Sequence, residues 1–363
     1  MGSKPDKAAD LPSCDSWLVH CRAGYEGNCA AELTEYLHLR GVPAAYAMAA
    51  RGEAWLRLVN PMPENGPDLA TLVPDDAIFP RQIIPLWRWL EALPTADRVT
   101  AIIEALPAGR DFNGLQISYP DSNEGKSLGR LIKPLSVALR QGMRSRGITL
   151  ERNGAPCLHL FFPDGRRVSI GHTRDDREPV GGVMRLRMPG AAPSRSTLKL
   201  DEAFRRLMGE EERGSLLSPG QRAVDLGAAP GGWTWQMVRR HIHVTAVDNG
   251  PMAPELMESG LVTHVRADGF TWRPERAVDW LLCDIVDKPA RVGQRMSRWL
   301  VEGWTRHAVF NLKLPMKQAW PTVRDLLRQL REELAESRPT VVVRARHLYH
   351  DREEITVIAL DKG

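Results

Sequence analysis

A short apolar strand, a turn of small residues and a helix follow one another in residues 222–240, RAVDLGAAPGGWTWQMVRR. We expect the strand to end at Asp225 and the helix to begin near Trp233. The turn between them consists of Gly227, Ala228, Ala229, Pro230, Gly231 and Gly232. Because glycine has no Cβ, such a turn lets the backbone approach a bound ligand closely. This succession is typical of the first strand–helix unit of a doubly wound α/β sheet.

The turn fits neither of two common phosphate-binding patterns, Gly-Lys-Ser/Thr of a P-loop and Gly-x-Gly-x-x-Gly of a dinucleotide site. The next strand ends in Asp248, where a carboxylate can bind both hydroxyls of a ribose. Asp268 follows a third strand in the same way. Together with Asp225, these residues predict a pocket for an adenosine that bears a positive centre, such as S-adenosyl-L-methionine. The alternative is a glycine-rich turn in another α/β enzyme, with aspartates that serve only as turn residues.

The remaining chain divides into zones by composition and periodicity. In residues 17–59 a strand, an amphipathic helix and a second strand predict a small βαβ-type unit. A proline-rich stretch, residues 60–76, separates it from an α+β module. For that module we expect helices at 83–93, 98–106 and 129–147, and strands at 114–120, 157–162 and 166–172. A linker rich in glycine and proline follows, and the last zone repeats strand, turn and helix as a doubly wound sheet does.

Positive charges are concentrated in the helix expected at 129–147 and just before it, although the formal net charge of the chain is only +4. The candidate RNA-binding residues are Lys126, Arg130, Lys133, Arg140, Arg144 and Arg146. A cluster of this density binds a phosphate backbone by releasing its counterions. A solvated helix face explains the charges equally well, so charge alone leaves both interpretations open.

The turn DLGAAPGGWTW resembles motif I of class I methyltransferases, and its APGGW form is similar to the FtsJ-type RNA 2'-O-ribose methyltransferases. Most class I enzymes carry Gly-x-Gly-x-Gly there instead. Further segments resemble the RlmM family of large-subunit rRNA methyltransferases: APSRSTLKLDEA, VDNGPM, DGFTWRPE, CDIVDKPARV, FNLKLPMKQ and LYHDREEITV. The resemblance is firm over the C-terminal half and looser over the N-terminal half, through HCRAGYEGNCAAEL and FPRQ.

This resemblance implies a Rossmann-like class I methyltransferase domain preceded by an α+β ferredoxin-like/THUMP region. The boundaries expected are a flexible extension at 1–15, a ferredoxin-like unit at 16–75, a THUMP-like RNA-binding domain at 76–180, a linker at 181–193 and the methyltransferase domain at 194–363. It also implies S-adenosyl-L-methionine as methyl donor. The substrate it implies is a cytidine in the peptidyl-transferase region of 23S rRNA, modified before assembly of the 50S subunit is complete.

Methyl transfer to a ribose hydroxyl benefits from a general base, and burial or a neighbouring cation can make a lysine suitable by disfavouring its charged form. Candidates are Lys199, Asp284 after an apolar strand, Lys313 at the end of AVFNLK, and Glu354 at the start of EITVIAL. We expect all four at the cofactor edge of the sheet. They resemble the Lys-Asp-Lys-Glu set of FtsJ-type enzymes. That resemblance implies Lys313 as base, Asp284 as its orienting group near the methyl donor, and Lys199 and Glu354 as groups that position the ribose.

Several of these residues have plainer interpretations. A lysine such as Lys199 is more often a solvated helix residue, whereas Lys313 interrupts an apolar strand and favours a function. Only strand phase separates Glu354 from Glu353, and we choose Glu354. Ser196 either contacts the amino-acid end of the cofactor or caps a helix. His350 is expected to be structural.

Other reactions leave different sequence patterns. Methylation of exocyclic adenine amines goes with Asn/Asp-Pro-Pro-Tyr, but residues 284–287 read Asp-Ile-Val-Asp. Carbon-5 methylation of cytosine needs a cysteine nucleophile, and Cys283 should point to the opposite face from Asp284. Two alternatives stay open: a non-catalytic RNA-binding assembly factor, and a 2'-O-methyltransferase of another RNA such as tRNA.

Composition bounds the class of protein. The chain has 363 residues, 43% hydrophobic and 26% charged, as globular proteins do. It has no apolar run long enough to cross a bilayer and no apolar secretion segment near its start, so we expect a cytoplasmic protein without a membrane partner. The five cysteines are scattered, which argues against disulfides and a metal site. We expect a monomer.

Overall fold

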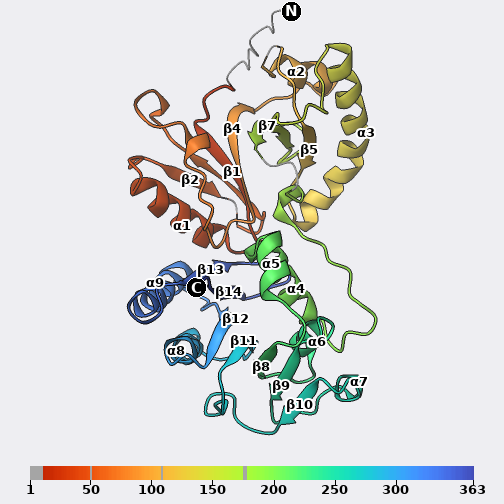
Figure 1. Cartoon of the computed structure of the whole chain (residues 1–363). Helices are drawn as coiled ribbons and strands as arrows, with labels where there is room; N and C mark the ends of the chain where they lie inside the picture. The colour runs from red at the N-terminus through yellow and green to blue at the C-terminus, as the bar shows by residue number, and fades with distance from the viewer. Residues whose placement is uncertain (1–10, 50, 108, 175–177) are drawn as a thin grey trace, which may run out of the picture. The chain divides into compact units, whose positions relative to one another are not determined.

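The computed structural model describes residues 11–49, 51–107, 109–174 and 178–363, which divide into two compact units (Figure 1). The first unit takes the described residues up to Asp75 together with Phe79–Val183, and the second takes Asp76–Ile78 and Met184–Gly363. Most of the flexible extension predicted at 1–15 lies outside the described residues. In the described part of the chain, no helix is both long and apolar enough to span a membrane.

The first unit is built on one seven-stranded sheet in the order β2-β3-β1-β4-β7-β6-β5. All neighbours are antiparallel except β5 and β6. The strands are β1 (Ser16–His20), β2 (Tyr46–Ala49), β3 (Trp55–Val59), β4 (Gln82–Leu90), β5 (Gly114–Ser118), β6 (Cys157–Phe161) and β7 (Val168–Thr173). The segments expected as a ferredoxin-like unit and a THUMP-like domain therefore contribute strands to a single sheet.

The helices of the first unit are α1 (Glu26–His38), α2 (Arg98–Glu104) and α3 (Asn123–Ser145), with short 3₁₀ turns at Pro63–Asn65, Leu69–Thr71 and Val180–Gly182. Helix α3 begins where the Ser122 hydroxyl accepts a hydrogen bond from the Gly125 N–H at 3.1 Å. Its apolar side, including Leu139 and Met143, packs with α2 against Leu158 and Ile170 of the sheet. The opposite side of α3 is left to solvent.

The helix predicted at 83–93 is wrong, because these residues form most of β4. Strand β4 pairs with β1 on one side and β7 on the other, and Gln82, Ile84 and Leu86 are buried on one face. The apolar residues of this segment are close enough together to satisfy helical spacing as well as alternation. The segment forms a strand because it pairs with two strands that are distant in sequence. The local periodicity of hydrophobic residues does not reveal such pairing.

The second unit holds the doubly wound sheet, in the order β10-β9-β8-β11-β12-β14-β13. Strands β8 to β12 are parallel to their neighbours, and β14 is antiparallel to both β12 and β13. The strands are β8 (Arg222–Leu226), β9 (His243–Val247), β10 (Val262–Val265), β11 (Val278–Cys283), β12 (Thr305–Lys313), β13 (Val341–Arg346) and β14 (Glu354–Asp361). The chain proceeds outward from β8 to β10 and then returns to β11. The carboxyl ends of β8 and β11 therefore meet at the point where such sheets bind ligands.

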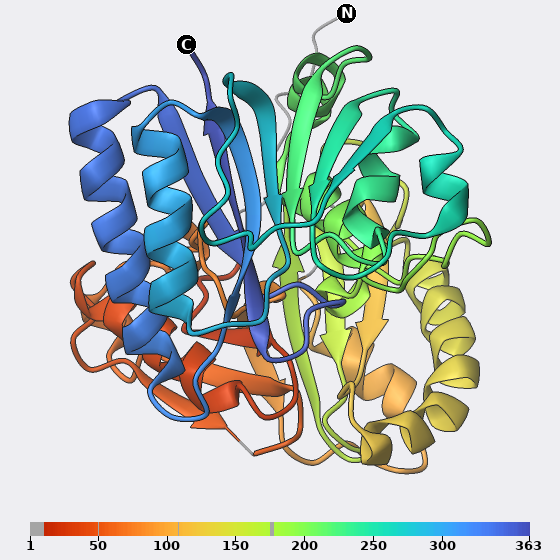
Figure 2. The same cartoon turned by 90° about the horizontal axis from the view of Figure 1, so that it is seen from below.

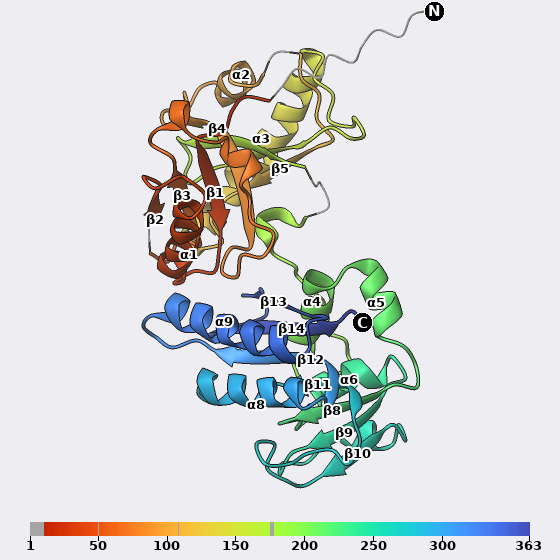
Figure 3. The same ribbon diagram turned by 60° about the vertical axis from the view of Figure 1, so that its left-hand side comes forward.

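Helices cover both faces of this sheet. Helices α8 (Pro289–Val301) and α9 (Ala319–Ser337) lie side by side next to β12 (Figure 2). Helices α4 (Thr197–Leu207) and α6 (Gly232–Val238) pack together on the other face (Figure 3). Two shorter helices are α5 (Glu210–Leu216) and α7 (Pro254–Met257). The core on the α4 side joins Phe204 and Trp233 to Leu282, Val309 and Ile358.

Strand alternation then determines which polar residues share the α4 side of the sheet. Val309 is the Cα partner of Ile358, and both belong to the core on that side. Because side chains alternate between faces, Asn311 and Lys313 of β12 lie on the same side as Val309. Their Cα partners on β14 are Thr356 and Glu354.

Candidate active site

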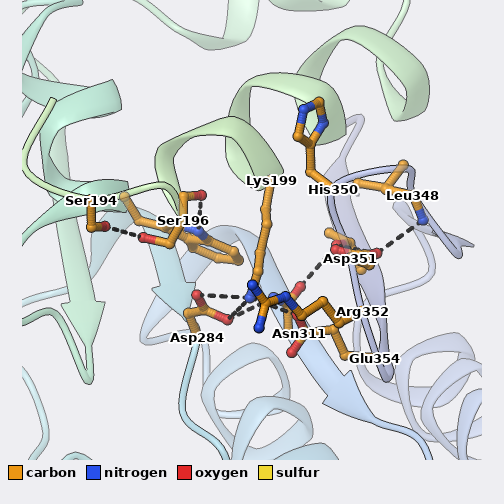
Figure 4. Close-up of polar contacts among 12 residues, drawn as sticks. Ser194, Ser196, Lys199, Asp284, Asn311, Leu348, His350, Asp351, Arg352 and Glu354 are labelled. Atoms are coloured by element: carbon orange, nitrogen blue, oxygen red, sulfur yellow. Dashed lines mark hydrogen bonds and ion pairs between the residues drawn. The ribbon is translucent and has the colours of Figure 1, made fainter. Parts of the chain in front are cut away.

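Lys199 lies between two carboxylates at the carboxyl edge of the second unit's sheet (Figure 4). Its Nζ is 2.6 Å from Glu354 Oε1, and it donates to Asp284 Oδ1 and Oδ2 at 3.1 and 3.3 Å. The three side chains are only 17, 17 and 13% exposed for Lys199, Asp284 and Glu354. Burial lowers the pKa of Lys199, but the attraction of Asp284 and Glu354 is larger in sum and raises it. Lys199 is therefore a cation shared by two acids.

Helix α4, which carries Lys199, also holds the loop that precedes Glu354 in place. Glu202, almost one turn after Lys199 on α4, is buried and accepts hydrogen bonds at 2.9 Å from the backbone N–H groups of Tyr349 and His350. The ring Nδ1 of His350 is 2.7 Å from the same carboxylate. His350 thus contacts Glu202 and not the Lys199 cluster. The loop before β14 is held against α4, which brings Glu354 to Lys199, while Glu353 is exposed.

Lys313 is the last residue of β12, and its side chain is exposed. The expectation that it interrupts an apolar strand is wrong, since the strand stops there and the residue lies at the open edge of the sheet. Its Cα pairs with that of Glu354, so both residues start from neighbouring positions on the same side. No hydrogen bond or ion pair of the Lys313 amine occurs within the described residues. Three members of the expected set are in contact, and the fourth is adjacent to them with its amine in solvent.

Asp225 occupies a different place from the one expected. Strand β8 continues to Leu226, so Asp225 is inside the strand and fully buried. Its carboxylate accepts a hydrogen bond at 2.6 Å from the hydroxyl of Thr234 on α6. Burial raises the pKa of Asp225 to about 7, with Asp284 and Asp248 adding to the rise against the Thr234 bond. The side chain ties β8 to α6 beneath the turn.

The turn 227–232 is shaped by close packing of glycines. Gly227 has φ of +73°, and a Cβ there would lie 2.5 Å from Cγ1 of Ile285. A Cβ on Gly232 would lie 2.1 Å from the Ser196 hydroxyl and 2.3 Å from that of Ser194. Those two hydroxyls are 2.7 Å apart, and Ser196 occupies the N-cap position of α4 as the cap interpretation expects, but its side chain makes no capping bond. The Ser196 carbonyl accepts from the indole N–H of Trp233 at 3.0 Å.

The two other aspartates follow their strands as expected. Asp248 comes directly after β9, and its carboxylate accepts from the N–H of Ala229 at 3.0 Å and of Gly250 at 2.7 Å. Each oxygen keeps acceptor capacity for a ribose hydroxyl. Asp268, after β10, is exposed and accepts from the N–H of Phe270 at 2.9 Å. A fixed carboxylate beside a turn that tolerates close backbone approach fits an adenosine.

Sequence reasoning missed three polar residues behind Asp284. Asn311 on β12, Thr356 on β14 and Asp351 in the preceding loop are all buried. The Nδ2 of Asn311 donates to Asp284 Oδ1 at 2.7 Å. A signal was present, because Asn311 and Thr356 are each two positions from a predicted site residue within apolar strands. Alternation alone would have placed both on the same face as Lys313 and Glu354.

Cys283 does not have the properties of a nucleophile. It is buried at the end of β11, and burial raises its thiol pKa to about 12. All five cysteines are free and buried. In the described ranges, no group of histidine, cysteine, aspartate or glutamate side chains is arranged to hold a metal ion.

The predicted RNA-binding residues of the first unit share one helix. Lys126, Arg130, Lys133, Arg140 and Arg144 lie on α3, and Arg146 follows it directly. All six side chains are exposed. Arg140 donates to the Leu115 carbonyl at 2.9 Å, and Arg146 is 3.8 Å from Glu104. The α3 surface therefore presents a row of solvated cations to any anionic partner.

Comparison with known proteins identifies the family. Three family models match: the RlmM ferredoxin-like domain over residues 14–84, the N-terminal domain of ribosomal RNA large subunit methyltransferase M over 97–174, and the FtsJ-like methyltransferase over 192–298. The chain is 44% identical over 347 residues to ribosomal RNA large subunit methyltransferase M of Xanthomonas oryzae pv. oryzae strain PXO99A, covering 94% of this chain and 98% of that protein. The chain belongs to the RlmM family.

A second RlmM relative, from Xanthomonas campestris pv. campestris strain B100, is 44% identical over the same shares of both chains. Among solved structures, TrmN from Thermus thermophilus is 15% identical over 96% of this chain and 100% of that one, with a TM-score of 0.34, too distant a likeness to carry an argument. Membership confirms the predicted family and the Rossmann-like methyltransferase fold with a ferredoxin-like N-terminal region. The RlmM chain is thus an FtsJ-like methyltransferase, whose methyl donor is S-adenosyl-L-methionine.

Proposed function

We propose that this RlmM-family chain transfers a methyl group to the ribose 2'-hydroxyl of a cytidine in the peptidyl-transferase region of 23S rRNA. The observation that carries the reaction type is the ion-paired cluster of Lys199, Asp284 and Glu354 at the carboxyl edge, with Lys313 beside it. Asp284 is followed by Ile285, Val286 and Asp287, so the site lacks the aromatic group with which adenine N-methylases hold a flipped base. The family resemblance supports the cytidine and its region.

Bound S-adenosyl-L-methionine supplies an electrophilic methyl group on a sulfonium. The residues suited to hold it are the turn 227–232, Asp248, Asp268 and Ser196. Asp284 lies beside this turn at the switch point, where its carboxylate would balance the positive centre of the bound donor. Its pKa is raised by burial and by Glu354, against the opposing effect of Lys199.

With the donor bound, the ribose hydroxyl would attack the methyl carbon, and Lys313 would act as the base that accepts the hydroxyl proton. The new O–C bond would replace the C–S bond of the donor, which would leave as a neutral thioether. Lys199, held between Asp284 and Glu354, donates to the ribose oxygens and fixes the angle of attack. Exposure of Lys313 fits this role, because the accepting amine has to meet a substrate that arrives from solvent.

RNA capture is assigned to the first unit. The six exposed cations on α3 and directly after it bind backbone phosphates and supply affinity without sequence information. A methylation pocket contacts only a nucleotide or two, so a separate capture surface suits a structured RNA. We further propose that the chain acts as a cytoplasmic monomer on rRNA before the 50S subunit is complete, since the target region is buried later.

The test supplies radiolabelled methyl donor and large-subunit rRNA from cells that lack this protein. We expect one labelled cytidine, resistant to alkaline cleavage on its 3' side, in the peptidyl-transferase region. Assembled 50S subunits and tRNA serve as competing substrates, and transfer to tRNA instead would establish the alternative substrate. Binding of rRNA without any transfer would favour a non-catalytic assembly factor and refute the proposal.

A further inference from the structure

Behind Asp284, three buried polar side chains are linked in series, namely Asn311, Thr356 and Asp351; Figure 4 labels the first and the last of them. Asn311 Nδ2 donates to Asp284 Oδ1 at 2.7 Å, and Asn311 Oδ1 is 2.8 Å from the Thr356 hydroxyl. That hydroxyl is 3.1 Å from each carboxyl oxygen of Asp351. Asp351 and Thr356 are fully buried, and Asn311 nearly so. The row leads from the edge where Lys199 lies to a carboxyl group that no substrate can reach.

The number of hydrogens that each side chain can donate determines which group is the donor in each hydrogen bond of this row. Asp284 sits against the Lys199 cation and is ionised, so it only accepts hydrogen bonds. Asn311 must therefore turn its NH₂ group toward Asp284 and its carbonyl oxygen toward Thr356. The carbonyl oxygen accepts the hydroxyl hydrogen of Thr356. A threonine hydroxyl carries one hydrogen, so nothing remains for Thr356 to donate to Asp351.

The contact between the Thr356 hydroxyl and the Asp351 carboxyl group is a hydrogen bond only if Asp351 supplies the hydrogen. Its Oδ2 already accepts the backbone N–H of Leu348 at 3.0 Å, which leaves Oδ1 to donate to the Thr356 hydroxyl. An ionised Asp351 would place lone pairs against lone pairs at this contact, in a site without solvent. Independently, burial raises the pKa of Asp351 well above its ordinary value; Glu354 and Glu202 add to the rise, while the Leu348 bond and Lys199 oppose it.

The opposite direction would require a proton on Asp284 and a charge on Asp351. That arrangement would remove the negative partner from Lys199, 3.1 Å away, and place it in the fully buried position. Both changes cost free energy, since a carboxylate beside a cation near solvent is more stable than a carboxylate in a fully buried position. The direction from Asp351 to Asp284 is therefore the stable one.

We propose that Asp351 is a neutral carboxylic acid that anchors a directional hydrogen-bond chain, Asp351 to Thr356 to Asn311 to Asp284, and so positions the Asp284 carboxylate for methyl transfer. Asp351 acts as a positioning residue, because it contacts neither donor nor RNA. The inference rests on the proposed function for its link to rate, but the protonation of Asp351 is independent of it. An asparagine at 351 can make the same bonds, since its NH₂ donates to Thr356 and its oxygen accepts from Leu348.

The activity test compares two pairs of variants in the full chain. Thr356→Val keeps the shape but removes the only donor to Asn311, so we expect kcat to fall about tenfold or more with KM for the methyl donor nearly unchanged. Thr356→Ser restores the hydroxyl and should recover most of kcat. Asp351→Asn should retain kcat within about threefold, whereas Asp351→Leu should lose it as Thr356→Val does. Equal losses in Asp351→Asn and Asp351→Leu would overturn the proposal.

The protonation test uses infrared spectroscopy and needs no activity. At neutral pH, the difference spectrum of wild type minus Asp351→Asn should contain the carbonyl stretch of a protonated carboxylic acid. A carboxylate band in its place would refute the neutral Asp351. If wild type shows the acid band but transfers no methyl group to rRNA, the proposed function fails, while the proposed hydrogen-bond chain is still supported. If Asp351→Asn does not fold, the comparison of Thr356→Val with Thr356→Ser is decisive. Equal kcat values for these two variants would overturn the proposed hydrogen-bond chain.

Discussion

The Lys199 cluster of the second unit and helix α3 of the first unit treat charge in opposite ways. The second unit buries charges and pairs them, as with Lys199 between Asp284 and Glu354. In the first unit, the cations of α3 are exposed, and the buried histidines stay neutral because burial lowers their pKa, to about 4 for His20 and about 3 for His159. Buried pairs fix the geometry of a few atoms, whereas exposed charges attract a polyanion from a distance without fixing geometry. The contrast separates a site built for chemistry from a surface built for capture.

The largest effect is expected where a buried pair is broken. Lys199→Met leaves Asp284 and Glu354 facing each other without their shared cation. We expect methyl transfer to fall more than about 10³-fold and the free energy of unfolding to fall by roughly 2 to 4 kcal/mol. Arg205→Met, an exposed residue of the same helix, is the control. Assay of kcat and urea unfolding check both values, and an active, stable Lys199→Met would erase the contrast between the units.

Lys313 tests whether an exposed cation in the second unit nevertheless serves chemistry. Lys313→Ala should lower kcat by about 10² to 10³-fold without changing the melting temperature, because the amine makes no hydrogen bond or ion pair among the described residues. Lys317→Ala, an exposed lysine four positions along, should change neither. If Lys313→Ala raises only KM for RNA, then Lys313 belongs with the capture surface.

Asp225 of the second unit and the buried histidines of the first unit should give pH dependences of opposite sign. Asp225 has its pKa raised to about 7 from 3.8, so the stability it contributes is present below about pH 4 and is lost as pH rises toward 7. His20 and His172 have pKa values lowered to about 4 from 6.5, so theirs is present above about pH 6.5 and is lost as pH falls toward 4. Across this pH range, the contribution of each group to the free energy of unfolding should change by about 2 kcal/mol or more.

Amide hydrogen exchange, corrected for the intrinsic effect of pH, measures each sheet separately. Amides of β8 and β11 should lose protection from pH 4 to 7, and amides of β6 and β7 should gain it. Asp225→Asn should flatten only the first of these slopes. Parallel slopes in both sheets would mean that the interior charges do not distinguish the units.

The smallest effect is expected on α3. Replacing Arg130, Lys133 and Arg144 together by alanine should raise KM for rRNA about tenfold at physiological salt and leave kcat unchanged. The slope of log affinity against log salt should shrink by about 0.7 to 0.9 for each phosphate that the variant no longer neutralises. Arg324→Ala with Arg328→Ala, two exposed arginines of α9, gives a matched control. An unchanged salt slope would show that α3 is only a solvated helix.

Features that depend on neighbouring residues could be predicted from the sequence, whereas features that depend on contacts between distant segments could not. The turn at 227–232 and the aspartate after β9 are determined by a few consecutive residues, and both were predicted. Strand β4 was missed because its pairing with β1 and β7 joins segments far apart in the chain. The choice of Glu354 over Glu353 depends on how Glu202 fastens a loop to α4, which no local pattern reports. Asn311 and Thr356 could have been found by counting alternate positions.

The order of strands at the β14 edge has a consequence for synthesis. Strand β14 follows β13 in the chain but lies between β12 and β13 in the sheet. A growing polypeptide therefore cannot seat β13 until the segment after it has emerged from the ribosome. Glu354 arrives with that segment, so the Lys199 cluster closes only when β14 has filled its place between β12 and β13. An incompletely translated chain would lack a working centre, and so could not methylate RNA prematurely.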